Sequence, residues 1–375
     1  MVPEGWQVGV VLDFFKLQRG FDLTKAEARD GPIPVYSSSG ISYFHDTMRV
    51  APPGIVTGRK GAVGPVYFVE TPFWPHDTTL WVTDFKKSNP KFVWYFLQWM
   101  DLSRLGEASS VPTLNRNNVH RQKCVFPPLP EQKKIAEILS TWDKAIETTE
   151  KRLANAEAQK QSLMQQLLTG KRRLKGFSGP WLHKPLAEIS TRIQRKTDGG
   201  DHPILTISST IGFVRQDQKY RRYMAGKSVE NYILLRQGEF AYNKGNSKTF
   251  EFGCVFDLNE FPTGLVPHVY VCFRLREGLS RRFFKALFAA DYLRPQLGRL
   301  VNTGVRNNGL LNISPSQFLT TQVPVPAYAE QEAIGAVLEE ATALEVKLKS
   351  DLELLRLEKS ALMQQLLSGK RRVVI

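Results

Sequence analysis

Cysteine is scarce in this chain, and histidine is nearly as rare. The sequence holds three cysteines and six histidines in 375 residues. Cys124, Cys254 and Cys272 form no Cys-x-x-Cys pair, and the histidines show no metal-ligand spacing. These absences exclude a disulfide framework and a zinc finger. A sparse, odd cysteine count is typical of a reducing cytosol, where we expect this protein to be located.

Long apolar runs are also missing. Nothing approaches 18 uninterrupted apolar residues, and the first residues, Met1 to Trp6, show no basic segment followed by an apolar core. We therefore expect no membrane span and no signal peptide. A hydrophobic content of 42% with 23% charged residues is ordinary for a folded protein. The length predicts two or more domains.

Catalytic motifs were sought without success. The nearest match to the Asn-Pro-Pro-Tyr motif of DNA methyltransferases is Asn89-Pro90-Lys91-Phe92, which lacks the second proline and lies where a helix is expected to begin. Gly170-Lys171-Arg172 and Gly369-Lys370-Arg371 lack the other residues of a phosphate-binding loop. Together these absences disfavour an enzyme, and we expect no cofactor or metal in this chain.

Positive charge is plentiful and unevenly placed. The net charge is +15, and the isoelectric point near 9.7 indicates a polyanionic partner. Residues 176–329 carry a balance of +9, whereas residues 1–130 carry +3. The charge therefore belongs mostly to one interior domain and does not form a basic tail.

An internal repeat defines the expected architecture. The stretch 163–173 returns as 362–372, and ten of its eleven residues, Leu-Met-Gln-Gln-Leu-Leu…Gly-Lys-Arg-Arg, are the same in both copies. The same offset carries Glu131-Gln132 onto Glu330-Gln331 without a gap. Two elements of one length and one register are therefore expected.

Each repeat copy predicts a long helix. Apolar residues such as Ile135, Leu139, Trp142 and Ile146 alternate spacings of four and three, and the series from Ile334 does the same. Neither segment has an internal proline, and Gly170 and Gly369 stand where a C-terminal cap belongs. We expect two rods of roughly 39 residues, about 58 Å long, which form an antiparallel coiled coil.

The two globular segments are weakly similar to each other. Each opens with a tryptophan and a short apolar strand, expected at Val11-Leu12 and Pro185-Leu186, and each contains a strand that ends in a Lys-Gly turn. Each also has a later helix, expected over 90–102 and 281–293. The predicted fold is α+β: a mixed α/β domain at 1–128, a long helix at 129–175, a second mixed α/β domain at 176–325 and a second long helix at 326–375, related by a pseudo-twofold repeat.

Several arginine, lysine and asparagine side chains in Gly- or Asn-rich loops are candidates for DNA contact. Arginine suits guanine and asparagine suits adenine, whereas lysine mostly meets phosphate. For any single residue a solvated charge or a turn-forming asparagine is an equal alternative. The candidates in the first domain are Arg59, Lys60, Arg116, Asn117 and Asn118. Those in the second are Arg215, Arg221, Arg222, Tyr242, Asn243, Lys244, Lys248, Arg306, Asn307 and Asn308.

This layout resembles the specificity subunit of type I restriction-modification systems. The resemblance rests on the tryptophan-initiated domains, the Gly58–Gly61 turn, the Pro-Leu-Pro-Glu-Gln helix entry that ends at Gln132, and the repeated helix ends. The second half departs from it, because Ala327-Tyr328-Ala329 separates Pro326 from Glu330 and the turn contains Asn243-Lys244-Gly245.

The resemblance implies a bipartite, asymmetric DNA target, with one half recognised by each domain. It also implies two methyltransferase subunits bound along the helices, and motor-nuclease subunits bound through them. S-adenosylmethionine and ATP with Mg²⁺ would bind those partners. Apolar residues beside the helix seam are the candidate partner contacts: Ile138, Leu168, Val337, Leu344 and Leu367.

Two other functions remain open from the sequence. The helices would also suit a scaffold that only organises partners, and sequence-specific binding to duplex DNA would distinguish it from a DNA reader. An unrecognised nuclease site at acidic residues such as Asp13 or Asp257 is the third possibility, and metal-dependent cleavage by the purified chain would indicate it.

Overall fold

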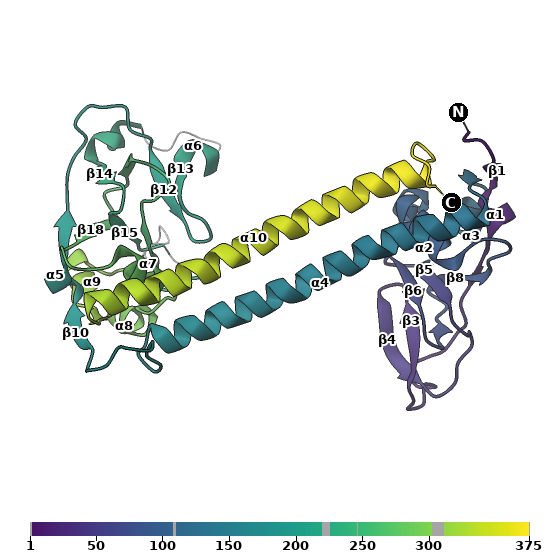
Figure 1. Cartoon of the computed structure of the whole chain (residues 1–375), viewed down its shortest axis with the longest axis horizontal. Helices are drawn as coiled ribbons and strands as arrows, with labels where there is room; N and C mark the ends of the chain where they lie inside the picture. Colours follow the sequence, from purple (N-terminus) through teal and green to yellow (C-terminus); the bar gives the residue numbers. More distant parts are fainter. Residues whose placement is uncertain (1, 108–109, 220–225, 246, 302–310, 375) are drawn as a thin grey trace. The chain divides into compact units, whose positions relative to one another are not determined.

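The computed structural model describes the chain except residues 1, 108–109, 220–225, 246, 302–310 and 375. It forms two compact units (Figure 1). The first unit contains residues 1–151 and 349–375, and the second contains residues 152–348. Each unit thus combines one globular domain with parts of both long helices, α4 (Leu129–Leu167) and α10 (Tyr328–Leu367).

The globular part of the first unit is mostly strands, with three short helices. Its elements are β1 (Gln7–Val10), α1 (Val11–Phe14), β2 (Lys16–Arg19), β3 (Ile33–Ser37), β4 (Gly40–His45), β5 (Gly54–Gly58), β6 (Val66–Val69), β7 (Trp74–Pro75), β8 (Thr79–Asp84), α2 (Pro90–Trp99), the 3-10 helix η1 (Leu102–Leu105), α3 (Arg116–His120) and β9 (Lys123–Phe126).

The second unit follows a similar order with additional strands. Its elements are β10 (Leu182–Pro185), α5 (Leu186–Ile189), β11 (Ser190–Ile193), β12 (Leu205–Ser208), β13 (Gly212–Arg215), α6 (Gln216–Lys219), the 3-10 helix η2 (Gly226–Asn231), β14 (Ile233–Arg236), β15 (Phe240–Asn243), β16 (Cys254–Asp257), β17 (Thr263–Val266), β18 (Val271–Leu275), α7 (Arg281–Ala289), α8 (Arg294–Leu300), α9 (Pro315–Leu319) and β19 (Gln322–Val325).

Both units are built on an antiparallel four-stranded sheet of corresponding order. The first is β2-β8-β5-β6 and the second is β11-β18-β15-β16. A two-stranded sheet accompanies each, β1-β9 in the first unit and β10-β19 in the second. The mixed α and β content and the repeat confirm the fold class expected from the sequence.

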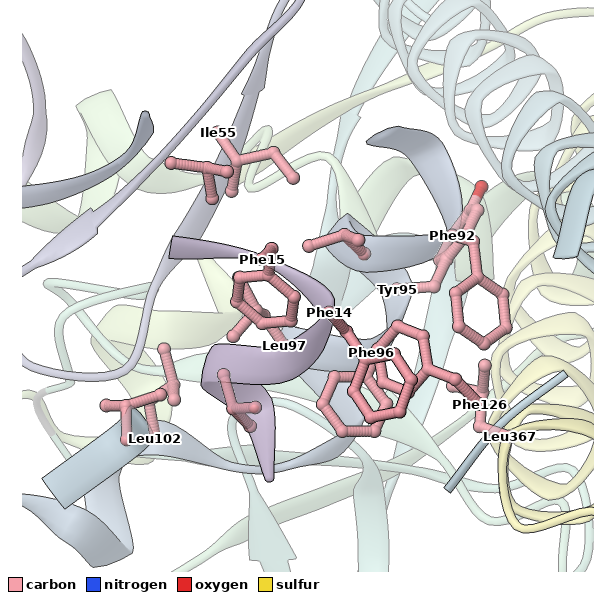
Figure 2. Close-up of a cluster of buried hydrophobic side chains, with 14 of the residues drawn as sticks. Phe14, Phe15, Ile55, Phe92, Tyr95, Phe96, Leu97, Leu102, Phe126 and Leu367 are labelled. Atoms are coloured by element: carbon pink, nitrogen blue, oxygen red, sulfur yellow. The ribbon is translucent and has the colours of Figure 1, made fainter. Parts of the chain in front are cut away.

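The core of the first unit is aromatic (Figure 2). Phe14 stacks on Phe126 with ring centroids 4.2 Å apart, and Phe96 contacts the same ring from α2. Leu366 and Leu367 of α10 are buried in this cluster. Burying such side chains contributes about 1.5–3 kcal/mol each, so the end of α10 is part of the core of the first unit.

The second unit has the reciprocal arrangement. Leu167 and Leu168, at the end of α4, are buried with Phe283 and Phe284 of α7 and with Ile334 of α10. The end of α10 therefore completes the core of the first domain, which precedes α4. The end of α4 likewise completes the core of the second domain, which precedes α10.

The long helices run antiparallel where they meet inside each unit. In the first unit Lys359 lies 2.5 Å from Asp143, and Arg356 lies 2.7 Å from Glu150. In the second unit Lys160 forms an ion pair with Glu345 at 2.9 Å. The prediction of two continuous helices is confirmed. Gly170 and Gly369 adopt φ values of +69° and +71° just beyond the last helical turns, as predicted for C-terminal caps.

The glutamate that occurs in both repeat copies forms a buried clamp. Glu131 has no exposed surface, and it accepts hydrogen bonds from Arg372 at 2.7 and 2.9 Å and from Trp6 Nε1 at 3.0 Å. In the second unit Glu330 accepts from Arg173 and, at 3.1 Å, from Trp181 Nε1. These two groups, named here the Trp–Glu–Arg clamps, join a helix start, a helix end and a domain start.

The glutamine that follows each glutamate joins the helix to its domain. Gln132 donates to Pro127 O at 2.9 Å and accepts from Asn89 N at 2.8 Å. Gln331 donates to Pro326 O and accepts from Ser280 N at 2.9 Å. Asn89 and Ser280 are themselves the N-caps of α2 and α7. The repeated Glu-Gln pair is thus explained by structure alone.

Some local predictions were wrong. Val11-Leu12 and the residues after Pro185 form helical turns, α1 and α5, and the strands come just before them. Helices α2 and α7 also end earlier than expected, at Trp99 and Ala289, because Asp101 and Asp291 adopt positive φ angles nearby. Asn89 caps α2, as expected for a helix start, by accepting from Phe92 N at 2.9 Å.

In the described part of the chain, no helix is long and apolar enough to cross a membrane.

Candidate nucleic-acid interface

The predicted Gly58–Gly61 turn lies at the end of β5 and is closely packed by its neighbours. The backbone N–H groups of Arg59 and Lys60 donate to Thr78 O at 2.8 and 3.1 Å, and Gly61 N donates to Pro112 O at 2.9 Å. A Cβ atom on Gly58 would lie 1.7 Å from the carbonyl oxygen of Ala62, so the turn requires glycine there. Lys60 is exposed at the surface.

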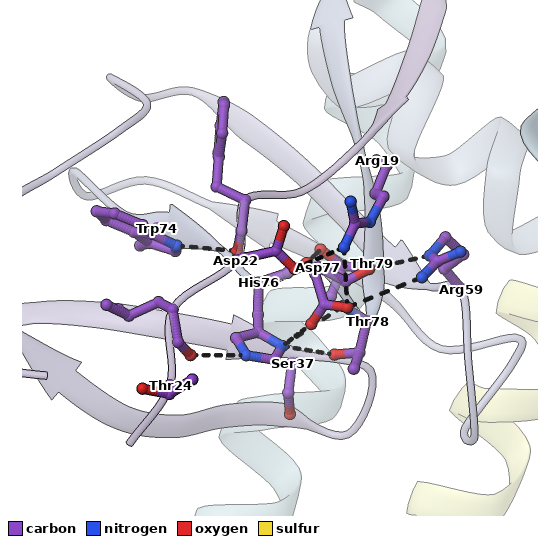
Figure 3. Close-up of polar contacts among 12 residues, drawn as sticks. Arg19, Asp22, Thr24, Ser37, Arg59, Trp74, His76, Asp77, Thr78 and Thr79 are labelled. Carbon is purple, nitrogen blue, oxygen red and sulfur yellow. Dashed lines mark hydrogen bonds and ion pairs between the residues drawn. The ribbon is translucent and has the colours of Figure 1, made fainter. Parts of the chain in front are cut away.

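Asp77 connects this turn to the end of β2 (Figure 3). Its backbone carbonyl accepts from Arg59 Nε at 2.9 Å, and its carboxylate lies 3.9 Å from Arg59 Nη2. The same carboxylate accepts from Arg19 Nη2 at 3.2 Å. Arg19 also pairs with Asp22 at 2.6 Å. The hydrogen bond to Asp77 is the main reason why the pKa of Arg19 is raised, so the Arg19 guanidinium stays charged.

His76 supports the loop that carries Asp77. One ring nitrogen lies 3.0 Å from Leu23 O, and the other contacts Thr78 Oγ1 at 3.1 Å and Asp77 Oδ1 at 2.9 Å. Gly20 allows β2 to approach this loop, because a Cβ atom there would lie 2.1 Å from His76 O. The loop at His76 and Asp77 therefore packs against the end of β2, through the Arg19–Asp77 contact and through the close approach of Gly20 to His76. The sequence analysis missed Arg19, His76 and Asp77.

The other candidates in the first domain lie in a short helix, not in a loop. Arg116, Asn117 and Asn118 belong to α3, which Asn115 caps by accepting from Asn117 N at 2.9 Å. The Asn-rich run is thus explained in part by helix capping. Arg116 and Asn117 are exposed, and Asn118 is half-buried beside Leu105 O.

The second domain has its own turn at the end of β15. Asn243 Oδ1 accepts from Gly245 N at 3.0 Å, which closes the turn, and Lys244 O accepts from Leu311 N at 3.1 Å. Tyr242 was predicted to contact DNA, and this prediction was wrong. Its ring is fully buried and stacks on Phe318 at 4.3 Å, and its hydroxyl donates to Phe252 O at 2.7 Å. Burial also raises its pKa well above the usual range.

Of the remaining candidates in the second domain, two lie in the described part of the chain and five lie outside it. Arg215 ends β13 and is exposed beside Asp217, at 3.4 Å, so it lies in a strand and not in a loop. Lys248 is exposed in the segment after β15. Five candidates lie outside the described residues: Arg221, Arg222, Arg306, Asn307 and Asn308.

The predicted partner contacts on the long helices separate by burial. Leu168 and Leu367 are buried in the cores of their own units, so the prediction that they face a partner was wrong. Ile138 and Val337 are half-buried against the same cores. Leu344 stays 44% exposed, and α10 presents further exposed apolar residues, among them Val346, Leu354 and Leu357.

The acidic residues weighed for a nuclease site have structural partners. Asp13 Oδ2 accepts from Val10 N at 2.8 Å, and the nearly buried Asp257 forms ion pairs with Arg281 and Lys285. In the described part of the chain, no cluster of three His, Cys, Asp or Glu residues could hold a metal ion.

A family model matches the N-terminal part of the chain. It describes the type I restriction modification DNA specificity domain and covers residues 3–158, which include the Arg59 turn and Asp77. Within residues 3–158 the chain is therefore similar to that domain family, which confirms the resemblance stated from the sequence for this part of the chain.

A curated relative extends the likeness beyond residue 158. It is 24% identical over 291 residues to the type I restriction enzyme MjaVIII specificity subunit of Methanocaldococcus jannaschii. That match covers 71% of this chain and 66% of the archaeal subunit.

Two solved structures share the fold. The S subunit of the type I restriction-modification system from M. genitalium is similar over 98% of this chain and 96% of its own, with a TM-score of 0.66 and 14% identity. A chain from a structure that describes complex assembly and conformational transition of a type I system is similar over 99% of this chain and 100% of its own, with a TM-score of 0.55 and 14% identity. At this identity the likeness concerns the fold.

Proposed function

We propose that this chain is the DNA-recognition subunit of a type I restriction-modification complex and that each unit recognises one half of a bipartite, asymmetric target. One observation carries the proposal. A turn with a Lys-Gly pair follows the third strand of the corresponding four-stranded sheet in both units, at Lys60-Gly61 and at Lys244-Gly245. A duplicated reader with a basic turn at the same place suits two half-targets.

The charge distribution supports the same proposal. The net charge of +15 lies mostly in residues 176–329, and exposed Lys and Arg side chains neutralise phosphates when they displace counterions. The candidate contacts in the first unit come from β2, the turn after β5 and the loop before β8. Because loops held by a sheet are common sites of recognition, this placement favours DNA binding.

We propose that the chemistry belongs to partner subunits. Methyltransferase subunits would transfer a methyl group from S-adenosylmethionine to adenine, and motor-nuclease subunits would use ATP and Mg²⁺ to translocate and cleave DNA. Exposed apolar side chains on α10 support a partner surface there, since Leu357 is 67% exposed. In the second unit a groove of about 370 Å³ between α4 and α10 is lined by Ala156, Leu163, Val337, Ala341 and Leu344.

Genome-wide mapping of methylated adenines tests the function. In cells that carry the gene with its partner genes, we expect methylated adenines within two short sequence motifs separated by a fixed number of base pairs. Deleting the gene for this chain removes those marks in full. Unchanged adenine methylation after deletion would contradict the proposal. If the chain were only a scaffold, the purified protein would bind no duplex sequence in preference to another.

A further inference from the structure

The strand register places Arg59 and Asn243 at equivalent positions. Gly58 of β5 pairs with Thr79 of β8, and Tyr242 of β15 pairs with Val271 of β18. The next residue is Arg59 in the first unit and Asn243 in the second. The two residues after that are Lys and Gly in both units, 60–61 and 244–245. Within these three residues the two turns differ only at the first, which is Arg59 in the first unit and Asn243 in the second.

The neighbours of that position differ in the same way. Arg19 of β2 pairs with Leu80, one residue after Thr79, and Ile193 of β11 pairs with Cys272, one residue after Val271. Arg19 and Ile193 are therefore equivalent, and so are Asp77 and Val269, two residues before these anchor points. The first unit carries Arg19, Asp77 and Arg59 where the second carries Ile193, Val269 and Asn243.

The three charged residues of the first unit restrain one another. Asp77 contacts Arg59 through Nε and Nη2 and contacts Arg19 through Nη2. A guanidinium carries five N–H donors, so each arginine keeps N–H donors that do not contact Asp77. Arg59 is 26% exposed and Arg19 is 47% exposed, so both reach the surface. The pair between Arg19 and Asp22 is exposed and adds little stability. A rigid arginine fork is the geometry that a guanine edge requires.

We infer that the position occupied by Arg59 and Asn243 specifies a base in each half-target. Arg59, held by Asp77 beside Arg19, recognises a guanine in the first half-target, and Asn243 recognises an adenine in the second. Lys60 and Lys244 bind phosphate and carry no base preference. Asp77 is a positioning residue. This inference rests on the proposed function and adds the base and the residue to it.

Asn243 is compatible with this role although its turn uses one of its atoms. Its Oδ1 accepts from Gly245 N, and an amide oxygen has two lone pairs. The hydrogen bond to Gly245 fixes the side chain in one orientation, as Asp77 fixes Arg59. Both units therefore present a restrained side chain at the same point on the sheet.

The test is a selection from randomised DNA duplexes by the purified full-length chain, followed by sequencing of the bound fraction. For the Arg59→Asn variant we expect the preference for guanine at one position of one half-target to fall on the order of tenfold. The other half-target stays the same. Arg59→Lys keeps the charge without the planar fork, so it retains overall affinity but loses the same preference. Asn243→Ala has the corresponding effect on one adenine in the other half-target.

Two further variants separate positioning from charge. Asp77→Asn weakens the guanine preference at the same position as Arg59→Asn. Lys60→Ala weakens binding to all sequences alike and lowers the slope of log affinity against log salt by about one. Glu150→Gln is the matched control, because it removes a carboxylate from an exposed Arg–Glu pair on the long helices, and it leaves both half-targets unchanged. Circular dichroism melting confirms that each variant is folded.

The outcomes distinguish this inference from the proposed function. If the unaltered chain enriches no sequence, the proposed function is wrong. If it enriches a bipartite target and folded Arg59→Asn and Arg59→Lys variants enrich the same one, the base assignment is overturned. A change in both half-targets on Arg59→Asn would equally overturn it, because the inference confines Arg59 to one half.

Discussion

The carboxylate of Glu131 is buried without any exposed surface, which is costly unless its charge is matched. In the first Trp–Glu–Arg clamp Arg372 supplies two parallel N–H donors, and the indole of Trp6 supplies a third. The guanidinium also lies 5.9 Å from the centre of the Trp6 ring. Because a planar fork matches a carboxylate, arginine suits this position better than lysine.

Replacing Arg372 with alanine should therefore destabilise the first unit, because it leaves the buried carboxylate of Glu131 without its cation. Arg372→Lys should recover part of that loss. Urea unfolding followed by tryptophan fluorescence measures the effect. Arg356→Ala is the control, since its ion pair with Glu150 is half-exposed and its loss should cost under about 1 kcal/mol. Equal effects of the two alanine variants would contradict the stabilising role of the clamp.

Asp291 illustrates the opposite case, because its surroundings disfavour the charged form of its carboxyl group. Burial raises its pKa to about 6, and its backbone adopts φ +52° just after α7. A carboxylate at a helix C-terminus also opposes the helix dipole. Since the folded pKa lies above the unfolded value, the stabilising protonated form is lost as pH rises through about 6.

Asp291→Asn should thus stabilise the second unit at pH 7, by roughly 1 kcal/mol because the half-exposed group is screened by solvent. Asparagine also tolerates the positive φ angle better. Thermal unfolding at pH 7 and at pH 4 checks this: the gain should shrink toward pH 4, where the original aspartate is protonated. A gain that grows at low pH would contradict the assigned cause.

At the scale of elements, exposure along α10 separates the proposed partner contacts from the core contacts. Leu357→Glu and Leu344→Glu alter exposed side chains, so they should leave the melting temperature within about 2 °C and reduce co-purification of the methyltransferase subunit at least several-fold. Leu367→Glu buries a charge in the first core and should unfold that unit instead. Pull-down assays paired with melting curves make the comparison. Full retention of the methyltransferase by both folded variants would remove this face of α10 from the interface.

The long helices were the most predictable elements. Their four-three spacing, uninterrupted by proline, and their terminal glycines locate them within a few residues, since these signals are local. Periodicity could not distinguish a residue facing a partner from one facing its own domain, and for that reason Leu168 and Leu367 were assigned to the wrong side.

The candidate interface was predicted only in part, because its members are brought together by the sheet. Arg59 and Lys60 stand in a recognisable Gly-rich turn, but Arg19 and Asp77 are 58 residues apart and meet through strand pairing with β8. Tyr242 lies in β15, where Phe240, Ala241 and Tyr242 are all buried. The strand therefore shows no alternation of buried and exposed residues, and a core tyrosine was mistaken for a surface one. A Pro-His pair occurs just before β8 and just before β18, at 75–76 and 267–268. This repeated pair could have indicated from the sequence that the two loops are equivalent.

For the whole molecule, the duplicated layout predicts that the two readers are exchangeable. Replacing residues 176–325 with the second domain of another family member should change one half-target and leave the other intact. Mapping methylated adenines in cells that express the chimaera tests this. A chimaera that keeps both original half-targets, or changes both, would show that recognition is shared between the units. The exchange of 3–126 is the reciprocal control.

The clamps also bear on the order in which this protein is made. Leu366, Leu367 and Arg372 complete the first unit, yet Arg372 is translated 241 residues after its partner Glu131. The second unit, residues 152–348, is continuous along the chain. It can therefore close its core on the ribosome, whereas the first unit must wait with its aromatic cluster incomplete. The domain encoded first is thus the one that folds last, and a nascent chain interrupted before residue 366 would carry one finished reader and not two.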